Sequence, residues 1–291
     1  MPNKYSFSIH NFKNLNKNEY RQRTEGLHIF HSLEWMNVIR ETLGVNHKIA
    51  ILRENEMIVA SIPFANYHNL FKGLCALPLQ FSGYYDSIIA DNNDVKKKIL
   101  SQFFEYCKKY KIYTQVPEVN EIKGFQNFLG YSIYRMELKV NSPIEEQILT
   151  RASKRMRSYT KSAINSNFVS STGGLELLDG FYLLYLQNMK EVGTPPLPKI
   201  YFKKIIKYFP KKARIILVKN HKQVCSGMLV LKVSKTELFT SVISTPRLYQ
   251  VGQSSHFIYL QAAREAQNLG CSVINFGRSI DGSGPALFKQ R

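Results

Sequence analysis

Residues 49–60 read Ile-Ala-Ile-Leu-Arg-Glu-Asn-Glu-Met-Ile-Val-Ala, and residues 215–226 read Ile-Ile-Leu-Val-Lys-Asn-His-Lys-Gln-Val-Cys-Ser. Each stretch is an apolar strand pattern, a short polar turn that contains asparagine, and a second strand pattern, which together predict a β-hairpin. Hairpins are common enough for two similar ones to arise by chance. Because the two copies lie in halves of similar length, they favour a duplicated α/β unit.

Helical and strand patterns surround both hairpins and divide the chain into two parts. Ser32 precedes an apolar helical pattern and is expected to cap that helix. We expect an α/β protein with two domains, residues 1–140 and 141–291. Further helices are expected at 91–111, 144–166, 179–191, 199–208 and 254–269, and further strands at 112–116, 131–140, 236–244 and 271–276, with the strand at 131–140 closing the first domain.

The composition is that of a folded globular protein. Of 291 residues, 44% are hydrophobic, yet no run of about eighteen apolar residues exists that would span a bilayer. The polar N-terminus lacks the apolar core of a signal sequence. The four cysteines are widely spaced without a metal-binding pairing, so we expect a reduced, cytoplasmic protein with no metal site.

Positive charge is concentrated in the second half of the chain. Residues 1–150 contain 18 Lys and Arg against 15 Asp and Glu, whereas residues 151–291 contain 22 against 6. The corresponding net charges, +3 and +16, favour contact with a polyanion such as RNA, a nucleotide phosphate, an anionic glycan or a lipid headgroup. A lysine-rich proteome would explain scattered lysines, but it does not account for the difference between the halves.

The C-terminal segment suggests a site for an anionic or oxyanion-bearing ligand. The last expected strand runs into a flexible turn at Gly282-Ser283-Gly284. Glycine lets the backbone approach a ligand closely, and the cations Arg278 and Lys289 flank the turn. The alternatives are that Lys289 is a solvated lysine near the C-terminus and that Arg278 forms a salt bridge with Asp281 or Glu237.

A loop at residues 246–255 joins an expected strand to an expected helix. The free backbone N–H groups of a helix N-terminus, together with the positive end of the helix dipole, suit phosphate or pyrophosphate. Candidate contacts to such a group are Gln250, Gly252, Ser254 and Ser255. An ordinary connection between a strand and a helix explains the loop equally well.

Other candidate contacts to substrate lie on expected helices. Arg155, Arg157 and Lys161 recur on about one face of a basic helix, which suits phosphate or diphosphate binding, although a solvated basic face is the commoner explanation. Asn188 and Thr194 stand near a helix end, where capping competes with a role in substrate binding.

Short motifs along nearly the whole chain keep a characteristic order: Ser32-Leu33-Glu34-Trp35, Pro63-Phe64-Ala65-Asn66-Tyr67, Arg157-Ser158-Tyr159-Thr160-Lys161-Ser162, Asn188-Met189-Lys190-Glu191-Val192-Gly193-Thr194-Pro195, Tyr201-Phe202, Phe276-Gly277-Arg278-Ser279, Gly282-Ser283-Gly284 and Phe288-Lys289. Together they resemble the FemA/FemB-like acyltransferases of the Gcn5-related N-acyltransferase (GNAT) superfamily, and most closely the branch found beside exopolysaccharide and PEP-CTERM genes. The loop at 246–255 similarly resembles the GNAT loop that holds the pyrophosphate of coenzyme A. Asn275 replaces a usual aspartate, Pro285 replaces a usual threonine, and the strand expected after Lys289 is absent, which suggests a shortened domain.

The resemblance implies tandem GNAT-like domains, each with a mixed, mostly antiparallel sheet flanked by helices. It also implies transfer of an acyl or aminoacyl group from a CoA thioester or aminoacyl-tRNA to an amine or hydroxyl of a cell-envelope or exopolysaccharide precursor, with no bound cofactor. Lys289 would stabilise the oxyanion of the tetrahedral intermediate, and the Phe288 carbonyl would orient the attacking amine. Arg278, with Ser279 beside it, would hold a phosphate or the glycine turn. No serine or cysteine stands in a nucleophile motif, so we expect direct attack in a ternary complex.

Two other classes of function stay open at this point. The charge of the second half also suits a non-catalytic protein that binds RNA or another polyanion, and the departures from the family pattern suit an inactive paralogue. Expected partners are an anionic or glycan-linked substrate, tRNA, and a membrane surface in a transient contact. Only its position suggests Asp281 as a general base.

Overall fold

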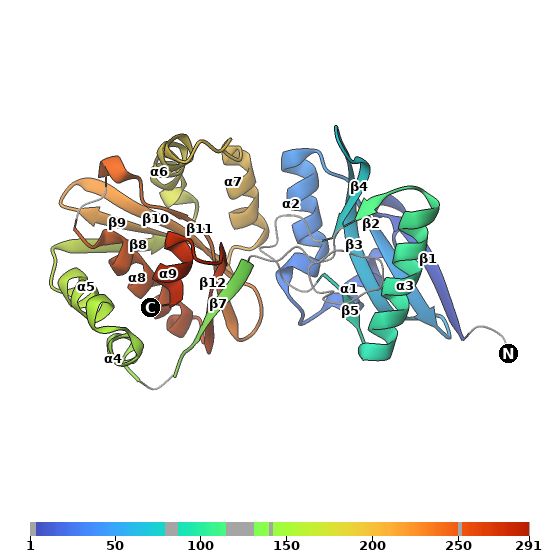
Figure 1. Ribbon diagram of the computed structural model, residues 1–291, viewed down its shortest axis with the longest axis horizontal. Coiled ribbons are helices and arrows are strands. Elements are labelled where there is room, and N and C mark those ends of the chain that lie inside the picture. Colours follow the sequence, from blue (N-terminus) through green and yellow to red (C-terminus); the bar gives the residue numbers. More distant parts are fainter. Residues whose placement is uncertain (1–3, 79–86, 115–130, 140–141, 250–251, 291) are drawn as a thin grey trace. The chain divides into compact units, whose positions relative to one another are not determined.

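The computed structural model describes residues 4–78, 87–114, 131–139, 142–249 and 252–290. The chain forms two compact units, Met1–Leu129 and Gly130–Arg291. In each unit one mixed sheet is packed between helices (Figure 1), which confirms the α/β class and the expectation of two sheets flanked by helices.

The sheet of the first unit has six strands in the order β1-β2-β3-β4-β6, with β5 paired to β3. Its neighbouring strands are antiparallel except for β4 and β6, which are parallel. The elements are β1 (Tyr5–Asn11), α1 (Lys17–Thr24), α2 (Leu33–Leu43), β2 (His47–Glu54), β3 (Met57–Asn69), β4 (Gly73–Pro78), β5 (Ile89–Ala90), α3 (Asn93–Lys109) and β6 (Tyr113–Thr114).

Alternation along β2 explains why helices cover both faces of this sheet. Ile49 and Ile51 point to the face on which α1 and α2 pack, whereas Ala50 and Leu52 belong to the core formed with α3. A strand with apolar residues on both faces reads as a continuous apolar run, as residues 49–52 do. Ser32 caps α2 as expected, because its Oγ accepts a hydrogen bond from the Trp35 N–H at 3.2 Å.

The sheet of the second unit has six strands in the order β7-β12-β11-β10-β9-β8. Only β11 and β12 are parallel among its described pairs. The elements are β7 (Tyr131–Glu137), α4 (Ile144–Arg151), α5 (Lys154–Ile164), β8 (Phe168–Gly173), α6 (Leu178–Glu191), α7 (Lys199–Tyr208), β9 (Ala213–Asn220), β10 (Gln223–Lys232), β11 (Glu237–Ser244), α8 (Ser254–Asn268), β12 (Val273–Ile280) and α9 (Gly284–Gln290).

Two helical layers enclose this second sheet. Ile216 and Val218 of β9 join α8 in one core. On the opposite face the backbone of Gly227 leaves room for Phe181 of α6, with Leu217 beside it. Phe181 in turn packs edge-on against a ring of α7. The helices α4 and α5 lie against the outer side of α8 and extend that layer.

The two units repeat one topology, which confirms the duplication predicted from the hairpins. A strand and two helices lead into a meander of three antiparallel strands, and the chain then passes through a helix to a strand that is parallel to the last strand of the meander. In both units the leading strand pairs antiparallel with the first strand of the meander. The repeated elements are β1-α1-α2-β2-β3-β4-α3-β6, with the short β5 inserted, and β8-α6-α7-β9-β10-β11-α8-β12. Both expected hairpins are present, β2 with β3 and β9 with β10.

The strand at Tyr131–Glu137 departs from expectation. We expected it to close the first unit, but β7 pairs antiparallel with β12 and forms an edge of the second sheet. The division between the units therefore falls at Leu129 and Gly130, before the expected boundary at residue 140. A strand pattern predicts pairing without specifying the partner, which is why sequence order was a poor guide here.

Two further differences concern the segment between β7 and α6. The basic helix expected at 144–166 is broken, because Ala152 and Ser153 adopt extended backbone between α4 and α5. The break lets α5 pack against α8 in its own direction. The strand β8 was not predicted, since Phe168–Gly173 mixes small polar residues with few apolar ones and lies at a sheet edge.

Candidate functional site

A pocket with a volume of about 120 Å³ lies on the α8 side of the second unit. Its walls come from β7, α4, α5, α8, β12 and α9, so distant parts of the sequence meet there. Most of the lining is apolar, and among the described residues that line it none is acidic. The lining residues are Met136, Ile148, Ala152, Met156, Thr160, His256, Tyr259, Leu260, Phe276, Phe288 and Lys289.

Lys289 is the charged group of this pocket. Its Nζ donates a hydrogen bond to the backbone carbonyl of Arg278 at 3.0 Å. Burial lowers the pKa of Lys289 to about 8, because a desolvated ammonium is less stable than a hydrated one. A half-buried ammonium without a carboxylate partner in the pocket wall is a suitable donor to an oxyanion.

The turn before α9 places Lys289 in the pocket. We expected a flexible glycine turn here, but Ser283 starts a helix, since its Oγ accepts from the Ala286 N–H at 3.3 Å. Pro285 is tolerated because it falls in the first turn, where its missing N–H would have no intrahelical partner. Phe288 lies in the last turn of α9 and lines the pocket beside Lys289, and the role of its carbonyl toward an amine stays a prediction.

A β-bulge in β12 aims the backbone carbonyl of Arg278 at Lys289. The pairing with β7 shifts register between Asn275 and Arg278, and Gly277 has φ +73°. A Cβ at Gly277 would lie 3.2 Å from the ring of Phe239. Glycine is therefore required here both by its backbone conformation and by the close approach of that ring.

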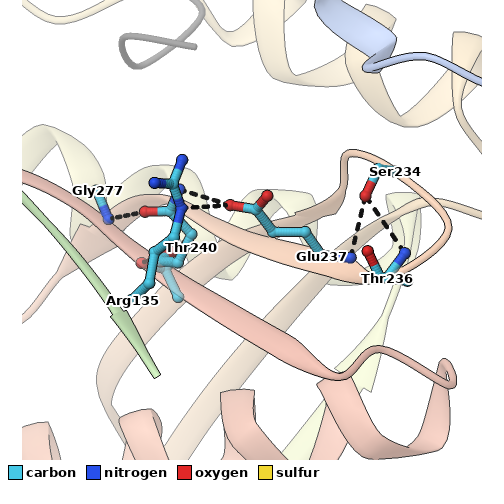
Figure 2. Close-up of polar contacts among 7 residues, drawn as sticks. Arg135, Ser234, Thr236, Glu237, Thr240 and Gly277 are labelled. Carbon is cyan, nitrogen blue, oxygen red and sulfur yellow. Dashed lines mark hydrogen bonds and ion pairs between the residues drawn. The ribbon is translucent and has the colours of Figure 1, made fainter. Parts of the chain in front are cut away.

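The buried amide of Asn275 fixes this bulge. Its Oδ1 accepts from the Gly277 N–H at 2.8 Å, and its Nδ2 donates to Oε1 of Glu237 at 2.7 Å. Figure 2 shows Glu237 also held by Arg135, whose Nε lies 3.2 Å away, while Ser234 accepts from the Glu237 N–H. An aspartate could accept from Gly277 but could not donate to Glu237, which gives the departure at position 275 a structural reason.

The parallel strands β11 and β12 separate at the same place. They pair only at three positions, ending with Phe239 opposite Asn275, although both strands continue further. Beyond this point lies the loop that leads to α8. Ligands of α/β sheets commonly bind at the carboxyl ends of parallel strands. The pocket lies next to this end, because Phe276 of β12, directly after Asn275, and residues of α8 line it.

The residues expected to bind phosphate lie around the loop before α8, and this site stays a prediction. Gly252 has φ +50°, and the N–H groups of Ser254 and Ser255 fall in the first turn of α8. Ser254 is fully buried, backbone included, whereas Ser255 is partly exposed, so Ser255 is the better candidate for contact with a ligand. Gln250 lies outside the described residues.

The expected substrate-binding residues lie at different places. Ser279 is buried opposite Ser132 in the pairing of β12 with β7. At the C-terminal end of α6 the Asn188 carbonyl accepts from the Val192 N–H, and the Thr194 N–H donates to the Met189 carbonyl. Neither Asn188 nor Thr194 lines the pocket. The Arg278 side chain is also absent from the lining, so its backbone carbonyl is the part that meets Lys289.

The cations of α5 are divided between two directions. Arg157 and Lys161 are exposed and, four residues apart, share one face. Arg155 lies with Tyr159 instead: its Nε donates to the Tyr159 hydroxyl at 2.8 Å, and its guanidinium lies over that ring. The expected single basic face is therefore wrong for Arg155.

His256 is the pocket residue that sequence reasoning missed. Its ring lies edge-on to Phe288 at 5.0 Å and to Tyr159 at 5.4 Å. Both ring nitrogens are buried without a hydrogen-bond partner among the described residues. Burial lowers the pKa of His256 below its ordinary value, so the ring is neutral at neutral pH. The available signal was its spacing, one helical turn before Tyr259 at the start of α8.

Within the described part of the chain, no group of three or more His, Cys, Asp or Glu side chains is placed to hold a metal ion. None of the helices described has the length and hydropathy needed to cross a membrane.

No protein-family model matches the chain, and no curated protein matches it either. Solved structures are similar. FemX shares 11% identity at a TM-score of 0.69, over 95% of this chain and 92% of FemX. A tandem GNAT protein from the clavulanic acid biosynthesis pathway has 8% sequence identity and a TM-score of 0.55, and the match covers 97% of this chain and 93% of that protein. L-PGS from Bacillus licheniformis has 11% sequence identity and a TM-score of 0.55, and the match covers 92% of this chain and 78% of L-PGS. The chain therefore has the tandem GNAT-like fold.

Proposed function

We propose that the second unit transfers an acyl or aminoacyl group from a CoA thioester or an aminoacyl-tRNA to an amine or hydroxyl. The observation that carries this proposal is the placement of Lys289, a cation in an acid-free, largely apolar pocket beside the end of a separating parallel strand pair. The fold shared with FemX and a tandem GNAT protein supports the same class of reaction.

Acyl transfer by direct attack needs a donor for the tetrahedral intermediate, whose negative oxygen develops as the nucleophile adds to the carbonyl. The Lys289 ammonium supplies that donor, and its bond to the Arg278 carbonyl holds it in place. The Phe288 carbonyl, in the last turn of α9, accepts from the attacking amine. Nothing in the mechanism requires a covalent intermediate on the protein.

The narrower assignment is a FemAB-like transferase of the cell envelope or of exopolysaccharide synthesis, acting in the cytoplasm on an anionic or glycan-linked precursor. The ordered motifs of the chain support it, and so do the exposed cations Arg157 and Lys161, which suit the phosphates of a nucleotide-linked substrate or of tRNA. A transient contact with an anionic membrane surface fits the same charge.

A second candidate, a non-catalytic polyanion-binding protein, is favoured by the same exposed face of α5. Arg157 and Lys161 stand on the solvent side of that helix and need no pocket to bind phosphates. This alternative predicts binding that weakens steeply with salt and that ignores Lys289.

Thermal shift with coenzyme A, acetyl-CoA and bulk aminoacyl-tRNA separates the two candidates. Transferase chemistry predicts saturable stabilisation by one donor, reduced in Lys289→Ala. Lys222→Ala, in the exposed turn between β9 and β10, is the matched loss of one charge and should behave as wild type. Salt-sensitive binding of any RNA, equal in all variants, would favour the polyanion binder.

A further inference from the structure

We propose that the pocket receives the chain of the transferred acyl group and that this chain is small, neutral and apolar rather than cationic. The proposal rests on the proposed function and defines its substrate class. It starts from the chemistry of the wall: the carbonyl end of an acyl group suits Lys289, and the rest of the wall offers hydrocarbon and sulfur. The apolar lining residues are Met136, Ile148, Ala152, Met156, Leu260, Phe276 and Phe288.

The absence of acids among the lining residues disfavours a cationic chain on energetic grounds. A buried ammonium needs a carboxylate or several hydrogen-bond acceptors, and the lining offers no carboxylate and only the side chains of Thr160, His256 and Tyr259 as acceptors. The same environment already lowers the pKa of Lys289, because the apolar wall keeps water away from its ammonium. A second ammonium in the same pocket, such as the α-ammonium of an aminoacyl group, would also repel the first, so this inference favours the CoA thioester of the two proposed donors.

The size of the pocket limits the length of the chain. Its volume of about 120 Å³ is close to that of an apolar cavity of about 150 Å³ that admits benzene. An acyl chain of about three to five carbons therefore fills it, whereas a fatty acyl chain exceeds it. The thioethers of Met136 and Met156 adapt to chains of slightly different shape.

A matched pair of free acids tests this binding without any transfer reaction. Pentanoate and 5-aminopentanoate have the same five-carbon chain and the same carboxylate for Lys289, and they differ by the added terminal ammonium. At millimolar concentration pentanoate should raise the Tm of the protein, 5-aminopentanoate should not, and Lys289→Ala should abolish the shift. Equal shifts with both acids, or none with pentanoate, would overturn the proposal.

A charge introduced into the wall should reverse the preference. Met156→Glu places a carboxylate on α5 at the pocket, so 5-aminopentanoate should bind better than pentanoate, by about tenfold or more. Met156→Leu keeps the apolar wall and is the control, with the wild-type preference. An unchanged preference in Met156→Glu would contradict the pocket assignment.

Transfer rates then separate this inference from the proposed function. With pentanoyl-CoA and 5-aminopentanoyl-CoA as donors, kcat/KM should favour the neutral chain by at least about tenfold. Equal rates with both donors leave acyl transfer standing and refute the pocket assignment. Binding of pentanoate with the stated preference, but no transfer from any CoA or tRNA donor, refutes the proposed function and keeps the pocket.

A second inference rests on the unpartnered ring nitrogens of His256. A buried polar atom without a partner destabilises the folded protein, so a partner supplied by a ligand explains why a histidine stands in an apolar wall. We infer that His256 accepts the proton of the attacking nucleophile. Catalytic hydrogen bonds are often completed only when substrate is bound. This agrees with the state of both His256 ring nitrogens, which are buried and have no hydrogen-bond partner among the described residues.

The proton balance of this step is complete. The nucleophile nitrogen or oxygen forms a bond to the acyl carbon, and its proton passes to the neutral imidazole. The intermediate then breaks its carbon–sulfur bond, or its ester carbon–oxygen bond, and the imidazolium returns the proton to the leaving group. The titratable groups around the ring are Lys289 on α9, Tyr159 on α5 and Tyr259 on its own helix; burial raises the pKa of Tyr259 to about 12, so it stays protonated.

His256→Phe is the informative variant, because it keeps a ring against Phe288 and Tyr159 while it removes both nitrogens. We expect kcat to fall by about 10²-fold with KM nearly unchanged, and the Tm to rise by a few degrees. The acidic limb of the kcat profile, set by His256 below its ordinary pKa, should disappear. His68→Gln, an exposed histidine of the first unit, is the control. A variant that keeps wild-type kcat, or keeps the acidic limb, would overturn the assignment.

Discussion

Replacing Lys289 with alanine lowers kcat for acyl transfer by about 10²–10³-fold, the loss that follows removal of one oxyanion donor. KM for the donor changes much less, because the donor's carrier portion contacts other residues and the oxyanion exists only after attack. The fold is preserved, since Lys289 contributes one hydrogen bond, to the Arg278 carbonyl. Steady-state kinetics with the best donor, alongside a melting curve, measure both effects.

The pH profile makes the same prediction specific to the ammonium. The pKa of Lys289 is lowered to about 8, so the charged form is present below that pH and is lost as the pH rises through it. Wild-type kcat should therefore fall on the alkaline side near pH 8. In Lys289→Arg the alkaline limb should move to higher pH, because a guanidinium keeps its proton.

A different outcome would place the oxyanion donor elsewhere. If Lys289→Ala and Lys222→Ala both keep wild-type kcat, the Lys289 ammonium takes no part in the reaction, and the transfer proposal loses its main residue. If both variants lose activity equally, the loss reflects general charge and not the site.

Asn275→Asp destabilises the second unit by about 2–4 kcal/mol at pH 7. The substitution retains the acceptor for the Gly277 N–H but replaces the donor to Glu237 with a second carboxylate, 2.7 Å from the first in the present geometry. Asn275 is 2% exposed, so solvent does not relieve the repulsion. Denaturant unfolding followed by circular dichroism, with hydrogen exchange of β12 peptides, measures the loss.

The loss should depend on pH with a definite sign. Two adjacent carboxylates raise the pKa of one of them, so at low pH a shared proton restores a hydrogen bond. As the pH rises through the raised pKa the proton leaves, and the destabilisation grows. Trp35, the single tryptophan, lies in the first unit and its fluorescence reports that unit as an internal control.

The double variant Asn275→Asp with Glu237→Gln provides the matched rescue. In this variant the glutamine at position 237 donates a hydrogen bond to the aspartate at position 275. Donor and acceptor have thus changed places, and the repulsion between two carboxylates disappears. Most of the lost stability should return, apart from the exposed ion pair between Glu237 and Arg135, which contributes less than about 1 kcal/mol. No rescue would show that the amide acts by packing and not through its hydrogen bonds.

Patterns that are local in sequence predicted the repeated framework well. The apolar runs at 49–52 and 215–218 indicate strands that are buried on both faces. Each hairpin turn follows within a few residues, so the two paired strands are neighbours in the sequence. The partner of β7 was not predictable in this way, because antiparallel pairing with β12 depends on which sheet edge is free after folding.

The candidate site shows the same limit. The position of Lys289 after a glycine turn is visible in sequence, and the structure places it in a pocket. His256 carries no such signal, because a histidine in a helix is ordinary until its neighbours are known. Its environment comes from α5 and α9, about a hundred residues before it and about thirty after it, and only folding brings them together.

The strand β7 has a consequence for how this half of the molecule can be inherited or exchanged. The visible repeat begins at β1 and at β8, yet the sheet beside the pocket is completed by a strand that precedes both α4 and β8. The unit of duplication and the unit of folding are thus out of phase. Recombination at the edge of the repeat would remove the neighbour of β12, so the piece that can move intact starts at β7.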